Sequence, residues 1–399
     1  MNNSISFTVA EKAVLIESIG FSVERNKNRI IAKLYFDYNP EPLLLTATAE
    51  TGDIVLINIL PFRIELAVNG VLCDEEWQYG NELFDLENLG KQPIDYSVEK
   101  VKPVKIKTET VNKIDGWIPS DGTFVGDCMP FSDGKNFHLF YLKDRHHHKS
   151  KWGKGAHQWA HIMSDDLKTW KTLPTAIEID DKEEGSICTG SVIIKDGKWY
   201  AFYGLRTMND VPTAIYRAVS DDGINFKKDK NFKLVLPEEY RQDNNRDPKL
   251  WQDENGVYHM LVTTSIKRND CWQGCLAHYK SYDLDNFTVT EPFQLVEEYP
   301  LDFGSPWEIE PECPDYFKFG DYYYLCSRSH YGYSKNPDGP FIYPKDNLIP
   351  VGYVPKSAFF KGQLIFVGFV WSADGYAGSV KIARAEQAKN GELKFLPLD

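Results

Sequence analysis

Residues 196–206 read DGKWYAFYGLR, a polar turn followed by an aromatic-rich strand. The same pattern occurs four more times, as DGKNFHLFYLKD (133–144), ENGVYHMLVTTS (254–265), FGDYYYLCSRS (319–329) and FKGQLIFVGFV (360–370). A second motif follows the first three copies, as SDDLKTWKT (164–172), SDDGINFKKD (220–229) and SYDLDNFTV (281–289), and SKNPDGPFIYP (334–344) resembles a degenerate fourth copy. Paired motifs that return every roughly 45–65 residues are typical of propeller blades. Five copies therefore predict a five-bladed β-propeller over residues 117–399.

The N-terminal part lacks these motifs but still has the pattern of strands. Short apolar runs such as RIIAKLYFDY (29–38) and DIVLINIL (53–60) alternate with polar turns. Asn69-Gly70, between FRIELAV and VLCDEEW, is a strong signal for a two-residue hairpin. We therefore expect an all-β protein in which residues 1–110 form a small antiparallel β-sandwich with an accessory role.

Composition excludes several classes of partner. The chain has 399 residues and a net charge of -13, whereas nucleic acid and anionic membranes require a basic footprint. No stretch approaches the roughly 18 apolar residues of a membrane span, and the N-terminus lacks the pattern of a secretory signal. Seven scattered cysteines fit free thiols in a reducing compartment, so we expect a cytoplasmic protein. The Cys271–Cys275 spacing has no second half-site, which argues against zinc.

Three acidic residues occupy the same position in three different repeats. Asp127 in FVGDCMPF precedes the first blade turn, Asp247 in NNRDPKLW precedes the third, and Glu312 in EPECPDYF precedes the fourth. Because the innermost strands of propeller blades face a central axis, acids at equivalent positions converge there. We expect these three carboxylates to share one central funnel, although isolated strand-end acids also commonly cap turns.

The motifs around these acids resemble those of glycoside hydrolase family 32, which includes invertases, levanases and inulinases. The resemblance covers residues 124–372 and rests on D-x-x-P-F, W-G-x-G-A-H-x-W-A-H, T-G-S, R-D-P-K and E-C-P-D in this order. It implies a retaining β-fructofuranosidase in which Asp127 is the nucleophile, Glu312 the acid/base and Asp247 a ligand of ring hydroxyls. It also implies that Arg246, Thr189 and Trp152 line the substrate subsite. No metal or cofactor is implied.

The chain departs from the family pattern at several positions. Asp127 lies in Gly-Asp-Cys-Met-Pro where the family has Asn-Asp-Pro-Asn-Gly, and Leu142 replaces a glutamine. We also expect no β-sandwich after the propeller of the kind that family members carry, and the N-terminal sandwich is a candidate substitute. These changes keep two alternatives open: an inverting propeller enzyme acting on arabinose or xylose chains, whose acids stand about 6.5–9.5 Å apart instead of about 5–5.5 Å, and a non-catalytic sugar-binding propeller.

Two features of the predicted site depend on its surroundings. Glu312 is flanked by Pro311, Cys313 and Pro314, and an apolar environment favours the protonated form that a general acid requires. Arg246 and Asp247 are adjacent, so in a regular strand they point to opposite faces unless a bulge intervenes. Whether both reach the pocket is therefore open at this point.

The segment LKDRHHHKSKWGK (142–154) is basic in an otherwise acidic chain. We expect it to border the funnel, with Arg145, His146 and His147 among the substrate-binding residues and an anionic substrate such as a phosphorylated sugar as one possibility. The alternatives are a solvated loop, a partner for acids of the N-terminal domain, or histidines that bind the hydroxyls of a neutral sugar. The predicted partner in every case is a small carbohydrate, and the oligomeric state is left open.

Overall fold

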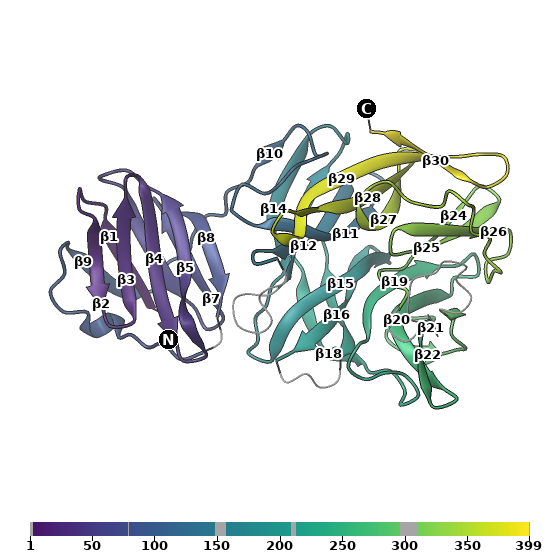
Figure 1. The fold of residues 1–399 in the computed structure, drawn as a ribbon, viewed down its shortest axis with the longest axis horizontal. Coiled ribbons are helices and arrows are strands. Elements are labelled where there is room, and N and C mark those ends of the chain that lie inside the picture. The colour runs from purple at the N-terminus through teal and green to yellow at the C-terminus, as the bar shows by residue number, and fades with distance from the viewer. Residues whose placement is uncertain (1–2, 79, 148–156, 209–212, 296–309, 399) are drawn as a thin grey trace.

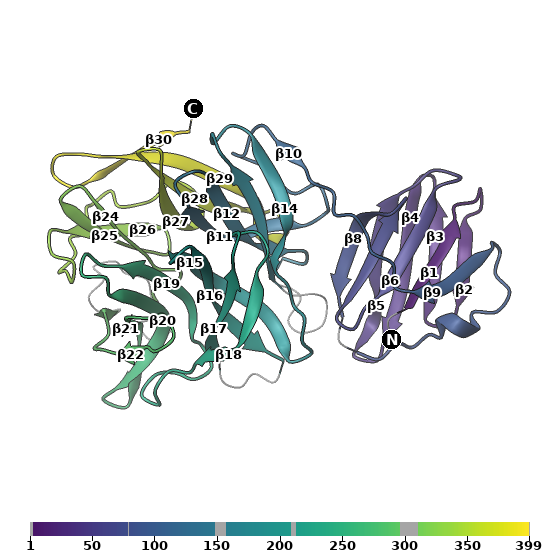
Figure 2. The same ribbon diagram turned by 180° about the vertical axis from the view of Figure 1, so that it is seen from behind.

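The protein consists of two bodies built almost entirely from β-strands. The computed structural model describes residues 3–78, 80–147, 157–208, 213–295 and 310–398. An N-terminal sandwich lies beside a larger C-terminal propeller, with the chain crossing once between them (Figures 1 and 2). Within the described residues the only helix is one 3-10 turn, Leu86–Asn88, and none is long and apolar enough to cross a membrane.

Two antiparallel sheets form the N-terminal sandwich. The first has the order β8-β7-β6-β1-β9, with strands β1 (Asn3–Thr8), β6 (Ile54–Ile59), β7 (Arg63–Val68), β8 (Val71–Trp77) and β9 (Tyr96–Lys100). The second has the order β2-β3-β4-β5, with strands β2 (Val14–Ser18), β3 (Phe21–Asn26), β4 (Arg29–Phe36) and β5 (Asn39–Thr48). The predicted sandwich architecture is therefore present.

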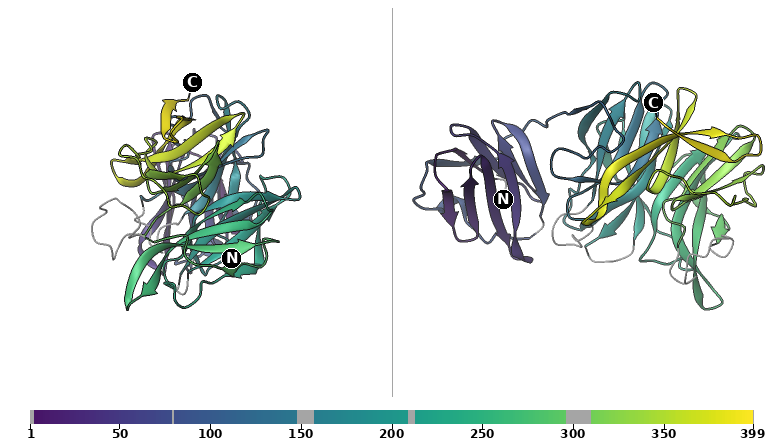
Figure 3. Two further views of the ribbon diagram at one scale, coloured as in Figure 1. Left: turned by 90° about the vertical axis from the view of Figure 1, so that its right-hand side faces the viewer. Right: turned by 45° about the horizontal axis from the view of Figure 1, so that its top comes forward.

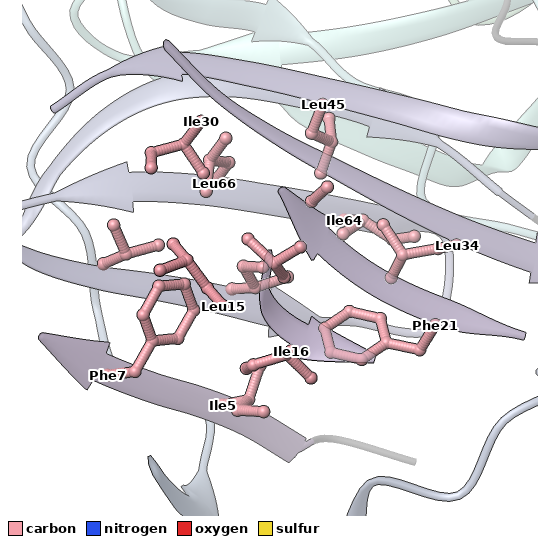
Figure 4. Packing of buried hydrophobic residues seen from close by; sticks show 14 of the residues in the cluster. Ile5, Phe7, Leu15, Ile16, Phe21, Ile30, Leu34, Leu45, Ile64 and Leu66 are labelled. Carbon is pink, nitrogen blue, oxygen red and sulfur yellow. The ribbon is translucent and has the colours of Figure 1, made fainter. Parts of the chain in front are cut away.

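The alternating pattern of these strands fills the space between the sheets. Inward side chains from both sheets, such as Ile5, Leu34 and Leu66, are fully buried and pack together (Figure 4). The hairpin between β7 and β8 has two central residues, Asn69 and Gly70, both with positive φ (51° and 76°). This conformation is the one that a two-residue hairpin requires, so the predicted turn is confirmed. The expected division into domains 1–110 and 117–399 stays a prediction.

The propeller strands group into five consecutive sets, which we call blades 1 to 5. Blade 1 contains β11 (Phe124–Ser132), β12 (Phe137–Asp144), β13 (Gln158–Ser164) and β14 (Trp170–Ile177), with the short β10 (Thr110–Val111) beside β14. Blade 2 contains β15 (Glu184–Lys195), β16 (Lys198–Thr207), β17 (Ala214–Ser220) and β18 (Lys227–Leu234). Blade 3 contains β19 (Arg246–Gln252), β20 (Tyr258–Arg268), β21 (Cys271–Ser281), β22 (Thr288–Val289) and β23 (Gln294–Leu295).

Blade 4 differs from the regular four-stranded pattern, and blade 5 closes the ring. Blade 4 has three described strands, β24 (Asp315–Phe319), β25 (Tyr322–Ser327) and β26 (His330–Ser334), and isolated bridges Tyr333–Ile342 and His330–Leu348 run along its outer edge. Blade 5 contains β27 (Tyr353–Phe360), β28 (Gln363–Ser372), β29 (Gly375–Gln387) and β30 (Leu393–Pro397). Pairing of β29 with β11 joins the C-terminal strands, yellow in Figure 3, to the first blade.

The second sequence motif forms the same turn in three blades. Asp166 Oδ1 accepts the backbone N–H groups of Lys168 and Thr169, and Asp222 and Asp283 accept the corresponding pairs in blades 2 and 3. The preceding serine hydroxyl also hydrogen-bonds each aspartate. An aspartate that holds two backbone donors fixes a tight turn, which explains why the motif repeats.

Blades 1 and 3 also share a buried pair of histidines. His138 Nδ1 lies 3.0 Å from His161 Nε2, and His259 Nδ1 lies 2.9 Å from His278 Nε2. Burial, with a smaller effect of His259, lowers the pKa of His278 to about 3. Burial therefore holds His278 neutral in the folded state.

We predict that stability falls as the pH is lowered from about 6.5 toward about 3, because the unfolded His278 binds a proton that the folded one does not. The titration of His278 lowers the free energy of unfolding by about 2 kcal/mol between about pH 7 and pH 5. His278→Gln removes the titrating group, so urea unfolding at both pH values should show a correspondingly smaller pH effect. An unchanged pH effect in the variant contradicts the prediction.

Candidate active site

The first strands of the blades contact one another around the centre of the propeller, and four of them carry the same irregularity. In each, two residues stand opposite one residue of the partner strand, between Val125 and Cys128, Ile187 and Gly190, Arg246 and Lys249, and Tyr353 and Lys356. A β-bulge of this kind re-aims the side chains of the bulged strand. The bulges hold Asp127 on β11, Thr189 on β15 and Asp247 on β19, and all three side chains face one pocket.

Glu312 reaches the same pocket from the segment just before β24. Its N–H donates to the carbonyl of Glu310, its own carbonyl accepts from Arg328 N, and Cys313 follows with a positive φ of 50°. The chain thus turns sharply here, and this irregular backbone brings Glu312 to the pocket from the fourth blade.

The pocket is a cavity of about 280 Å³ at the centre of the propeller. Its lining combines the acids and two arginines, Arg206 and Arg246, with aromatic rings from blade 5. The complete lining comprises Asp127, Leu142, His157, Ser186, Cys188, Thr189, Arg206, Arg246, Asp247, Glu312, Cys313, Tyr353, Val354, Phe369, Trp371 and Tyr376. Tyr353 and Trp371 are 50% and 47% exposed and lie 5.0 Å apart, so they form an open aromatic surface at the mouth.

Hydrogen bonds hold both oxygens of Asp127. Tyr376 Oη donates to Oδ1 over 2.9 Å, and Thr189 Oγ1 donates to Oδ2 over 2.5 Å. The Cys313 thiol also lies 3.4 Å from Oδ2. Burial, reinforced by the charge of Asp127, raises the pKa of Tyr376 well above its usual value, so its hydroxyl remains a proton donor. The carboxylate of Asp127 is therefore fixed in orientation.

Gly126 makes this arrangement sterically possible. A Cβ at this position would lie 2.5 Å from Tyr376 Oη, closer than side-chain carbons approach other atoms. The glycine thus allows the tyrosine hydroxyl to reach both the N–H of Asp127, at 3.2 Å, and its carboxylate.

Arg246 connects the other two acids. Its Nε lies 3.5 Å from Asp247 Oδ2, and its Nη2 donates to Glu312 Oε1 over 2.8 Å. Burial raises the pKa of Asp247, and the guanidinium partly offsets this effect. The bulge at Arg246–Lys249 and the positive φ of Asp247 (57°) explain how two adjacent residues both line the pocket. This answers the question that the sequence left open.

The surroundings of Glu312 differ from the expectation of an apolar environment. Its side chain is 40% exposed and is paired with Arg246, because the chain turn at Cys313 directs it toward this arginine in the pocket. The neighbouring acids face elsewhere. Glu310 is buried, where it binds Arg246 Nη1, Asn244 and Ser265, and Asp315 is buried beside Lys249 and Ser357.

The basic segment divides between two positions. Arg145 pairs with Asp74 and Glu76 of β8, and His146 Nε2 lies 2.6 Å from Glu76 Oε2. His147 packs on Phe124 and bonds the carbonyl of Tyr376 through Nδ1. None of the three lines the pocket, which differs from the expectation that they border the substrate. Trp152 and the lysines Lys149, Lys151 and Lys154 lie outside the described residues.

Several pocket residues were not singled out from the sequence. Tyr376 and Trp371 come from the last blade, where the chain returns beside the first, and no local motif marks them. His157 is the histidine of the W-G-x-G-A-H motif, but the motif did not predict that this side chain lines the pocket. Arg206 ends the first quoted repeat, and its guanidinium makes no hydrogen bond or ion pair with any other described residue.

Comparison with known families identifies the propeller. The model of the glycosyl hydrolases family 32 N-terminal domain matches residues 129–362. This match covers more than half of the chain, and the protein belongs to glycosyl hydrolase family 32.

The similar curated proteins include enzymes that act on sucrose phosphate and levan. The chain is 32% identical over 189 residues to the sucrose-6-phosphate hydrolase of Bacillus subtilis, covering 45% of this chain and 37% of that protein. It is 26% identical over 301 residues to the sucrose-6-phosphate hydrolase of Escherichia coli, covering 66% and 59%. A levanbiose-producing levanase of Bacillus subtilis is 29% identical over 202 residues, covering 47% and 33%. The matches thus span between 33% and 59% of these relatives, less than two thirds of each.

Solved structures share the fold at low identity. A fructan 1-exohydrolase from Cichorium intybus in complex with 1-kestose has a TM-score of 0.56 and 18% identity, covering 71% of this chain and 60% of that one. A β-fructofuranosidase from Bombyx mori in complex with sucrose has a TM-score of 0.53 and 20% identity, covering 70% and 65%. An exo-1,5-α-L-arabinanase from a bovine ruminal metagenomic library has a TM-score of 0.50 and 18% identity, covering 69% and 98%.

Proposed function

We propose that the protein is a retaining glycoside hydrolase that cleaves β-fructofuranosides by double displacement. The observation that carries this proposal is the convergence of Asp127, Asp247 and Glu312, from three blades, on one pocket of a family 32 propeller. The names of the similar proteins, which act on sucrose 6-phosphate and levan, support a fructosyl substrate.

The geometry supports the following roles. A carboxylate oxygen of Asp127 attacks the anomeric carbon, the glycosidic C–O bond breaks, and Glu312 gives its proton to the departing oxygen. Glu312 then removes a proton from water, the water oxygen attacks the anomeric carbon, and the ester bond to Asp127 breaks. Asp247, buried and close to Arg246, accepts hydrogen bonds from ring hydroxyls. The exposed rings of Tyr353 and Trp371 suit the apolar face of the leaving sugar.

The test is product analysis of the purified protein with sucrose, sucrose 6-phosphate, levan, inulin and arabinan. We expect release of fructose or a fructose-containing product, with NMR showing that the first-formed anomer keeps the β configuration. An inverted product indicates the propeller enzymes that act on arabinose or xylose chains, and binding without any turnover indicates a sugar-binding protein.

The free state of all seven cysteines supports our further proposal of a cytoplasmic location.

Arg206 is the residue that we expect to favour an anionic substrate. Its guanidinium lies in the pocket without a charged partner in the described residues, whereas Arg246 is committed to three carboxylates. Hydrogen bonds to charged groups contribute about 1.5–3 kcal/mol, so Arg206→Gln should raise KM for sucrose 6-phosphate roughly 10-fold or more and change KM for sucrose by less than about 3-fold.

Arg384→Gln is the matched control, because this arginine pairs with Glu386 and does not line the pocket. Steady-state kinetics should give KM for both variants with sucrose 6-phosphate and with sucrose. Equal effects of Arg206→Gln on the two substrates would reject a role in binding an anionic group.

A further inference from the structure

The residues directly after β12 contact the N-terminal sandwich through paired charges. Arg145 Nη2 lies 2.8 Å from Asp74 Oδ2, its Nε lies 3.3 Å from Glu76 Oε2, and His146 also binds Glu76. We call these four residues the interdomain clamp. Asp74 and Glu76 are each only 5% exposed, so the clamp is largely shielded from water. Removing one partner of a buried ion pair strongly destabilises the fold, because the other charge is left buried without compensation.

Strand alternation sends the residue between Lys143 and Arg145 in the opposite direction. Lys143 binds Glu75 of the sandwich, whereas Asp144 points toward the propeller centre. Its Oδ2 lies 2.6 Å from Nε2 of His157, which lines the pocket, and its Oδ1 accepts the N–H of His147 over 2.5 Å. When the interdomain clamp fixes the end of β12, Asp144 therefore also fixes the positions of His147 and His157.

Both histidines contact Tyr376. His147 Nδ1 lies 2.8 Å from the Tyr376 carbonyl oxygen, and the rings of His157 and Tyr376 are 5.4 Å apart. Tyr376 in turn donates to Asp127 Oδ1. A continuous series of contacts thus leads from the sandwich, through the end of β12, to the carboxylate of Asp127.

We propose that the N-terminal sandwich positions the nucleophile: the interdomain clamp holds the end of β12, and Asp144, His157 and His147 pass this constraint to Tyr376 and Asp127. Asp74 and Glu76 are positioning residues that never touch substrate. This inference rests on the proposed role of Asp127. It gives the sandwich a part in the reaction, since a displacement of about 1 Å at the reacting atoms can cost about 100-fold in rate.

The test compares two variants that each remove one carboxylate between the bodies. Glu76→Gln breaks the interdomain clamp, whereas Glu178→Gln breaks the Arg63–Glu178 pair, at 2.7 Å, which is linked to β12 only indirectly, through Glu75, and does not line the pocket. We expect Glu76→Gln to lower kcat roughly 10-fold with KM changed by less than about 2-fold. Glu178→Gln should leave both constants within about 2-fold of wild type. Equal changes in kcat for the two variants, or no change for Glu76→Gln, overturn the proposal.

Hydrogen exchange supplies a readout that does not require turnover. In Glu76→Gln, the peptides containing Asp127 and Tyr376 should exchange faster than in wild type, because Asp127 N–H is bonded to Tyr376 Oη. In Glu178→Gln their exchange should be unchanged. If wild type fails to hydrolyse fructofuranosides but this difference appears, the proposed function fails and the contact series stands. Unchanged exchange in Glu76→Gln overturns the inference whatever the activity.

Discussion

Asp127→Asn will reduce turnover of a fructofuranoside by at least about 10⁴-fold, because the amide cannot form the covalent glycosyl intermediate. The Asn oxygen can still accept from Tyr376 and its amide N–H can donate to Thr189 Oγ1, so the fold and the pocket should persist. Substrate binding, measured by calorimetry, should therefore survive the loss of turnover. This combination separates a missing nucleophile from a damaged site.

Trapping the intermediate locates the nucleophile directly. Rapid quenching with an activated fructofuranoside, followed by mass spectrometry, should find the fructosyl group on the peptide of β11 that contains Asp127. The Asp127→Asn variant should give no labelled peptide. Label on Asp247, or residual turnover above about 1% of wild type, is incompatible with the proposed role of Asp127.

Glu312→Gln will lower kcat on sucrose by about 10²–10⁴-fold, the usual contribution of general acid–base catalysis. The loss should be smaller on an aryl fructofuranoside, whose leaving group needs no proton. Azide should then accelerate the second step and yield a fructosyl azide, because it attacks the intermediate without base assistance. The nucleophile Asp127 remains intact in this variant.

Glu310→Gln provides the matched control for this prediction. Glu310 binds the same Arg246 but does not line the pocket, so its loss disturbs the arginine without removing an acid/base. We expect a reduced rate without azide rescue. Rescue in both variants, or an inverted product with either, assigns the acid/base role elsewhere.

Much of the propeller was predictable because its information is local and repeated. In blades 1 to 3 a turn depends on an aspartate that lies two and three residues before its backbone donors, and strand alternation buries aromatic side chains in the blades. The same phase in three repeats predicted that Asp127, Asp247 and Glu312 would converge, and all three line one pocket. Within the described residues, the outer parts of blades 3 and 4 depart from the regular four-stranded pattern.

The surroundings of each acid were less predictable. Flanking prolines and aromatics suggested an apolar environment for Glu312, yet its carboxylate meets Arg246 of another blade. The basic residues Arg145 and His146 suggested a substrate-binding loop, yet their partners are Asp74 and Glu76, about 70 positions earlier in the chain. A side chain's charge is visible in the sequence, but its partner depends on which distant strands meet.

The sequence by itself determined the sandwich, the repeated blades and the identity of the three central acids, because turns and alternating strands are encoded within a few neighbouring residues. The tertiary structure decided which groups touch those acids. The bulge in β19 turns Asp247 and Arg246 into one pocket, and closure of blade 5 onto blade 1 brings Tyr376 to Asp127. Contacts such as that between Tyr376 and Asp127, 249 positions apart, follow from the packing of whole strands, which no local pattern specifies.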